Sequence, residues 1–292
     1  MVRLSRPASE NPPPEVVYGP TPLLRQPLAL LRSMARDFVS SRHLAYRLLI
    51  RSLRSQYRQS LLGYFWVLIA PIGATGGLLF LSKQNIFRTV ETPVPYGLYL
   101  FVGILLWQIF IDSYQRPLQW LSTYRLVMGR VNFPREALIL GALYEVLIQA
   151  GIRASVILFV LLWLGREIGA AFLFALLAIV VLIGLGLVVS LILAPIGLLY
   201  GDVERSMTLV MLFWFIMTPV VYPPPADWPA SLLNHVNPVA PLVVTAKELV
   251  FGTELTHLGP FLVVSICMIP TLLVASLILR LALPHLVERV SG

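Results

Sequence analysis

The sequence predicts an all-α integral membrane protein with six transmembrane helices, and three observations predict it. Of the 292 residues, 58% are hydrophobic and 12% are charged, whereas soluble domains carry about 25% charged residues. Several apolar runs reach the roughly 20 residues that cross a bilayer core of about 30 Å. Positive charge is concentrated near the N-terminus, where ten arginines fall within the first 58 residues. This composition excludes a soluble enzyme and a disordered chain.

Two segments precede the first span. Residues 1–27 contain seven prolines, which prevent a continuous helix, and we interpret them as a Pro-rich cytoplasmic tail without a secretory signal peptide. Residues 28–60 alternate leucines with arginines, as in a basic amphipathic helix that lies on the cytoplasmic membrane surface. We therefore expect an interface helix over 28–60.

Apolar runs then predict a six-span domain over residues 61–283. The expected spans are 61–81, 96–121, 138–164, 172–200, 207–222 and 258–283. With the N-terminus inside, 17 of the 22 Lys and Arg residues fall on the cytoplasmic side and four on the outer side. The positive-inside rule supports this orientation, which also places the C-terminal segment 284–292 in the cytoplasm.

The loop between the fifth and sixth spans, residues 223–257, is Pro-rich and yet apolar. A solvated loop would be more polar. We expect short re-entrant helices here, with their backbone covered by protein or by a water-filled cavity.

No pattern for catalysis is present. The four histidines are far apart in the sequence, and the single cysteine excludes an intrachain disulfide framework. Neither lysine follows a glycine, so the chain lacks the GxxxxGK[ST] loop that holds nucleotide phosphates. We expect no catalytic residue, no metal site, no cofactor in this chain and no nucleic-acid partner.

Polar and aromatic residues within the spans are the remaining candidates. Glu145, Gln149 and Arg153 are spaced by four in the third span, which favours either an inter-helix network or a polar channel wall. Aromatic rings stack on the C–H faces of sugars, but they also serve as packing and interfacial residues. The candidate channel-lining aromatics are Tyr64, Phe65, Trp66, Trp107, Phe213, Trp214 and Tyr222.

Three segments carry a resemblance to a known family. The run Arg54-Ser-Gln-Tyr-Arg58-Gln-Ser-Leu-Leu-Gly-Tyr-Phe-Trp66, continuing to Pro71, is the first. Asn132-Phe-Pro-Arg-Glu136 is the second, and Thr218-Pro-Val-Val-Tyr-Pro223 followed by Asn237-Pro-Val-Ala-Pro241 is the third. Together they resemble the permease subunits of ABC-type polysaccharide exporters, the Wzm-like and KpsM-like proteins of O-antigen, capsule and teichoic acid export.

The resemblance implies a homodimer of permeases with two ATPase subunits that bind ATP and Mg²⁺, in the bacterial inner membrane. It implies a lipid-linked glycan as the substrate. The implied ATPase-coupling residues are Arg125, Arg130, Phe133, Pro134, Arg135 and Glu136, and the implied external gate residues are Pro223, Trp228, Asn237 and Pro238. Arginine pairs well with phosphate, so Arg47, Arg51, Arg54 and Arg58 are candidates for contact with the lipid pyrophosphate and with membrane lipids.

Two other functions fit the residues less well. One is an ABC permease that exports a small amphiphile such as a drug or a lipid, which would need a lateral opening rather than a tunnel. The other is a membrane glycosyltransferase or ligase, for which the outer loops offer few clustered acidic residues.

Overall fold

The computed structural model describes residues 27–58, 65–84, 91–130, 136–166, 168–225, 231 and 236–291. The chain divides into two units, Met1–Ser40 and Ser41–Gly292. In the first unit the described part is the beginning of one helix. The second unit contains the remaining helices and every contact discussed below.

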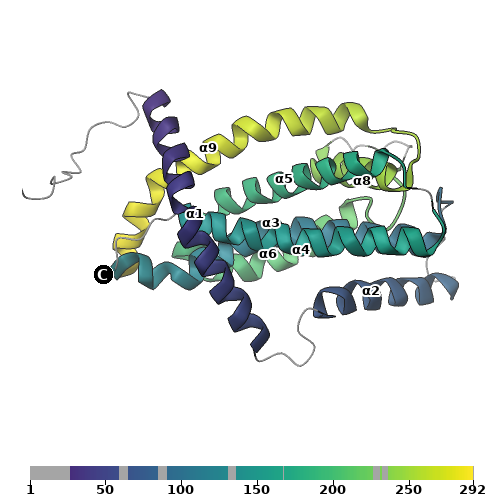
Figure 1. The fold of residues 1–292 in the computed structure, drawn as a ribbon, viewed down its shortest axis with the longest axis horizontal. Helices are drawn as coiled ribbons and strands as arrows, with labels where there is room; N and C mark the ends of the chain where they lie inside the picture. The colour runs from purple at the N-terminus through teal and green to yellow at the C-terminus, as the bar shows by residue number, and fades with distance from the viewer. Residues whose placement is uncertain are drawn as a thin grey trace, which may run out of the picture. The chain divides into compact units, whose positions relative to one another are not determined.

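The described residues form helices and connecting turns, without a strand among them. Figure 1 labels the helices in chain order. Their bounds are α1 Pro27–Arg58, α2 Trp66–Lys83, α3 Tyr96–Arg130, α4 Glu136–Trp163, α5 Ala171–Leu199, α6 Asp202–Met217, α8 Val239–Phe251 and α9 Leu258–Ser291. The predicted all-helical fold is thus confirmed for the described residues.

Five helices are long and apolar enough to cross a membrane, namely α2, α3, α4, α5 and α9. At 16 residues, α6 is only about 24 Å long. The expected fifth span at 207–222 is helical only as far as Met217. Thr218 is extended, with φ −97° and ψ 135°, because the ring of the following Pro219 disfavours helical geometry at the residue before it. A sixth membrane-spanning helix, at the position of the expected fifth span, therefore remains a prediction.

The core lies around α3, which packs most extensively against α5 and also against α4, while α5 packs against α8 and α9. Gly186 on α5 allows a close crossing, since a Cβ there would lie 2.4 Å from the Cβ of Ser113 on α3. Phe110, Ile109 and Leu182 are fully buried near this crossing. This packing makes α3 the central helix of the second unit.

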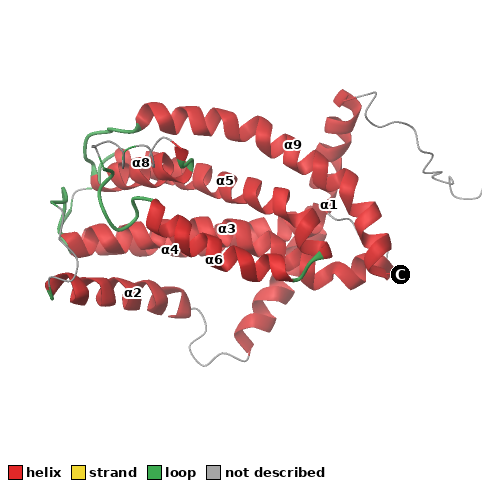
Figure 2. Cartoon of the chain, turned by 180° about the vertical axis from the view of Figure 1, so that it is seen from behind, coloured by secondary structure: helices red, strands yellow, loops and turns green. Residues whose placement is uncertain are grey.

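By contrast, α2 and α9 bury little of their surface: 17% and 11% of the residues in their apolar segments are buried. Such surfaces suit contact with lipid or with another protein. Figure 2 shows that most of the described loops lie at one end of the helices. In the orientation expected from the sequence this end would face the outer side of the membrane, and we call it the outer end.

Three helix ends differ from the expected ones. The helix α3 continues to Arg130, past the expected end at 121, so the loop before α4 is shorter than expected. The helix α9 continues to Ser291. The helix α6 begins at Asp202 rather than at 207, because Asp202 and Glu204 in its first turn interact favourably with the helix dipole.

Candidate functional site

Polar side chains of α3 and α4 form a buried ion network within the apolar helices. Arg153 Nη1 lies 2.7 Å from Asp112 Oδ2, and Arg116 Nη1 lies 3.2 Å from Glu145 Oε1. With its amide oriented to suit its neighbours, Gln149 donates to Asp112 and accepts from Arg116. Two carboxylates thus balance two guanidinium groups, as a low-dielectric site requires. The name hairpin network is used below for six residues, Asp112, Arg116, Trp120, Glu145, Gln149 and Arg153.

The hairpin network pairs two stripes of side chains in register. Residues 112, 116 and 120 of α3 face residues 153, 149 and 145 of α4, in that order. Each step of four residues along α3 matches a step of four in the opposite direction along α4, as expected for antiparallel helices. The structure therefore favours the inter-helix alternative for Glu145, Gln149 and Arg153, which are 0%, 3% and 5% exposed.

Glu145 also connects this network to α1. Its carboxylate accepts hydrogen bonds from Trp120 Nε1 at 2.9 Å and from Gln56 Nε2 at 3.0 Å, while Ser52 Oγ lies 3.5 Å away. The second half of the expected interface helix is thereby joined to α3 and α4 through one buried carboxylate.

A second polar site lies at the outer end. Residues 218–222, called the outer arm, follow α6 as non-helical turns and bends, and four consecutive carbonyls, those of residues 219–222, accept side-chain hydrogen bonds. Lys247 Nζ lies 2.7 Å from the Pro219 oxygen and 3.3 Å from the Val220 oxygen. The hydroxyls of Tyr96 and Tyr99 donate to the oxygens of residues 221 and 222, at 3.2 and 3.1 Å. Non-helical backbone at membrane depth needs such partners.

Asn237 joins the outer arm to α8. Its Oδ1 accepts from Trp214 Nε1 at 2.8 Å and from the Val239 N–H at 3.0 Å, while its Nδ2 donates to Thr218 Oγ1 at 2.8 Å. The amide thus ties the end of α6, the arm and the first turn of α8 together. Two of the motif segments quoted above, at 218–223 and 237–241, are brought together here.

Replacing Asn237 with alanine is expected to cost about 2–3 kcal/mol of stability, because it leaves the partly buried indole N–H of Trp214 and the buried hydroxyl of Thr218 without this partner. The measurement is the thermal unfolding midpoint of the detergent-purified chain. Thr208→Ala is the matched control, since that exposed hydroxyl bonds only within its own helix. Equal unfolding midpoints for the two variants would contradict the role of Asn237 in holding α6, the outer arm and α8 together.

The channel candidates lie in two kinds of surroundings. Trp107 is 4% exposed and packs against Phe110 and Phe215, with ring centroids 5.3 and 5.6 Å apart. Trp214 is partly buried and contacts Phe110 edge-on. Three others are open, with Phe65, Trp66 and Phe213 at 69%, 57% and 64% exposure. Tyr222 is partly exposed on the arm, and Tyr64 lies outside the described residues.

The candidates for gate, coupling and phosphate contacts are described in part. Pro223 and Pro238 are partly exposed, and Trp228 lies outside the described residues. Glu136 begins α4 and lies 3.9 Å from Arg280 of α9. The helix α1 presents Arg47, Arg51 and Arg54 on its exposed face and buries Ser41, Ala45, Leu48 and Leu49 on the other. Arg125 is exposed on α3. The described residues do not include Phe133, Pro134 and Arg135, nor the side chains of Arg58 and Arg130.

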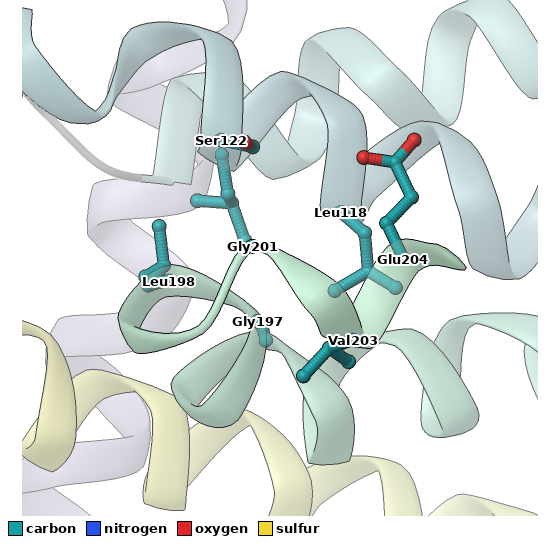
Figure 3. Close-up of a pocket in the computed structure, with 9 residues that line it drawn as sticks. Leu118, Ser122, Gly197, Leu198, Gly201, Val203 and Glu204 are labelled. Atoms are coloured by element: carbon teal, nitrogen blue, oxygen red, sulfur yellow. The ribbon is translucent and has the colours of Figure 1, made fainter. Parts of the chain in front are cut away.

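A pocket lies between α3, α5 and the turn into α6 (Figure 3). Leu118, Leu198 and Val203 line it, with Ser122 and Glu204 at its polar edge. Its volume of about 30 Å³ is enough for one or two water molecules. This pocket cannot hold a sugar chain.

Sequence reasoning missed the residues that hold both sites. The spacing of Asp112 and Arg116 by four residues favours a pair within α3, but they are 4.0 Å apart and each has a closer partner on α4. The equal four-residue spacing of 112–120 and 145–153 is the signal that could have found this register. The role of Lys247 has no such signal, since a lysine in an outer loop is ordinarily solvated.

Curated proteins of known name include relatives of this chain. No family model matches the chain. An O-antigen export system permease protein RfbA of Myxococcus xanthus is 26% identical over 252 residues, which cover 83% of this chain and 94% of that protein. A protein of the same name from Klebsiella pneumoniae is 24% identical over 219 residues, covering 71% of this chain and 80% of that protein. The resemblance inferred from the sequence is confirmed: this multi-pass inner-membrane chain is similar to the ABC permeases of O-antigen export systems.

Proposed function

We propose that the chain is the transmembrane permease subunit of an ATP-driven exporter that moves a lipid-linked cell-surface polysaccharide across the inner membrane. A separate ATPase subunit supplies the hydrolysis. The observation that carries the proposal is the similarity to O-antigen export permeases over 94% of the length of one relative. The five apolar helices agree with a transport subunit.

The proposed ATPase contact is the segment 124–136, which includes the end of α3 and the start of α4. Further along these two helices, the hairpin network pairs them through the contacts of Arg116 with Glu145 and of Asp112 with Arg153. Because the pairing fixes their register, a push on the segment would move both helices together instead of sliding one along the other. Through Gln56 and Glu145, the same motion would reach α1.

A polymer path would form between two copies of the chain in this proposal. The described pocket has no room for a glycan, whereas α2 and α9 leave most of their apolar segments exposed. The exposed rings of Trp66 and Phe213 are the candidates for sugar contact, since stacking needs an open aromatic face. Homodimerisation is part of the proposal.

The experiment is to co-purify the chain with the ATPase subunit encoded beside it and to measure ATP turnover with and without lipid-linked glycan. Stable co-purification and glycan-dependent turnover are expected. Turnover stimulated by small amphiphiles but not by glycan would favour a drug or lipid exporter. If no ATPase binds, the coupling role of 124–136 is wrong.

Replacing Arg54 and Arg58 with glutamine is expected to reduce glycan export about tenfold while the complex still assembles, because glutamine cannot pair ionically with the lipid pyrophosphate. The measurement is surface glycan per assembled complex. Arg32→Gln together with Arg36→Gln, earlier in the same helix, is the control. Unchanged export in the Arg54/Arg58 variant would remove the phosphate role.

A further inference from the structure

Lys247 is a buried cation whose contacts with the described residues are made with uncharged groups. Its side chain is 2% exposed within α8. The ammonium lies 2.7 Å from the Pro219 oxygen, 3.3 Å from the Val220 oxygen and 3.8 Å from the centroid of the Tyr99 ring. An ammonium has three N–H donors, and two carbonyls and one aromatic face are within their reach.

The neighbouring acidic residue is engaged elsewhere. The carboxylate of Glu248 accepts hydrogen bonds from the backbone N–H and the hydroxyl of Thr256, and His257 Nδ1 lies 3.9 Å from it. A buried charge without an ion partner is costly, so packing alone does not explain a lysine here. The contacts of Lys247 hold the backbone of the outer arm in place.

Tyr99 holds the same segment in a second way. Its ring lies against the ammonium of Lys247, and its hydroxyl donates to the oxygen of Tyr222 at 3.1 Å. Gly103, one turn further along α3, lets the arm approach, since a Cβ there would lie 2.2 Å from the Val220 oxygen. The backbone of the arm is thus bound along α3 and α8, while the side chains of Val221 and Tyr222 stay partly exposed.

We propose that Lys247 is a positioning residue for export, which anchors the outer arm so that Val221 and Tyr222 close the outer mouth of the path between transport cycles. This inference rests on the proposed function, because it takes the outer end of α6 as part of that path. The arm moves only when the contacts of the ammonium with the two carbonyls are given up. Tyr99 and Tyr96 keep the arm in register when the contacts form again.

The test measures the exposure of the arm in the full-length chain. In a Cys267→Ser background, Val221→Cys is labelled from the outer side with a membrane-impermeant maleimide in spheroplasts. Lys247→Met keeps the length of the side chain but removes its charge and donors, and is expected to raise the labelling rate about tenfold by freeing the arm. Ala170→Cys, exposed in the outer loop before α5, is expected to label at an unchanged rate.

Two further variants separate anchoring from general folding. Tyr99→Phe keeps the ring beside Lys247 and loses only the hydroxyl bond to Tyr222, so a smaller increase in labelling is expected. Tyr99→Leu loses both contacts and is expected to behave like Lys247→Met. The Tyr99 variants still test the anchor if Lys247→Met does not accumulate in the membrane. If a variant also raises the labelling rate at Ala170→Cys, the protein has unfolded more generally, and this result would overturn the proposed anchoring role.

Closure is read separately, as passive entry of a small impermeant dye and as glycan export per molecule of permease. Lys247→Met is expected to admit more dye and to export less glycan than the parent. Equal labelling at position 221 and equal dye entry in Lys247→Met and the parent would overturn the anchor. If the parent exports no glycan but labelling still responds to Lys247→Met, the proposed function fails and the anchor stands.

Discussion

Replacing Glu145 with glutamine is expected to lower the stability of the purified chain by about 3 kcal/mol, since removal of the buried carboxylate leaves the partly buried guanidinium of Arg116 without its closest ion partner. The carboxylate is fully buried and lies 3.2 Å from Arg116 Nη1. It also accepts from Trp120 and Gln56. An amide has a single acceptor oxygen for these donors, so some of them lose their partner.

The measurement is thermal unfolding in detergent, where a fall of roughly 5–10 °C in the midpoint is expected for a domain of this size. Ser155→Ala is the control on the same helix, because that exposed hydroxyl bonds only to Gly151 within α4. Adding Arg116→Gln to Glu145→Gln removes the stranded charge and should recover part of the loss. A double variant that loses the sum of both single effects would show that the two charges do not interact.

Replacing Gly103 with alanine is expected to displace the outer arm, with a cost of about 1–3 kcal/mol and a large loss of export. The added Cβ would lie 2.2 Å from the carbonyl oxygen of Val220. Since that neighbour is backbone and not a flexible side chain, the segment itself has to shift. The shift would also separate the Val220 oxygen from Lys247.

Gly151→Ala is the matched control for this variant. Gly151 is also a glycine within a helix, but a Cβ there would meet nothing within 4 Å. Alanine favours a helix over glycine by about 1 kcal/mol, so this control should be neutral or stabilising. Export is measured as surface glycan per molecule of permease. Equal export by the two glycine variants would mean that the close approach at Gly103 is not required.

The fold class follows from features that sequence displays directly. Long apolar runs predict membrane helices because a bilayer leaves the backbone few other ways to satisfy its polar groups, and α4 and α5 begin within two residues of the expected positions 138 and 172. The end of α6 was less predictable. Its apolar run continues to Tyr222, and only Pro219 marks the change to extended backbone.

The sites were predictable where the periodicity is local. The spacing of Glu145, Gln149 and Arg153 predicts a polar stripe, and the structure adds its partners on α3. Contacts between distant segments give no such signal, because they depend on how the helices pack. Lys247 reaches a carbonyl 28 residues earlier in the chain, and no local pattern around it indicates that it is buried.

The dependence of the outer arm on later residues has a consequence for biogenesis. When α6 and the outer arm have been synthesised, the carbonyls of Pro219 and Val220 still lack the partner that comes with Lys247 in α8. Only the bonds from Tyr96 and Tyr99, which precede the arm in the chain, are available at that stage. In a chain truncated before α8, the outer arm should therefore remain incompletely folded. We expect membrane quality-control proteases to degrade such a chain.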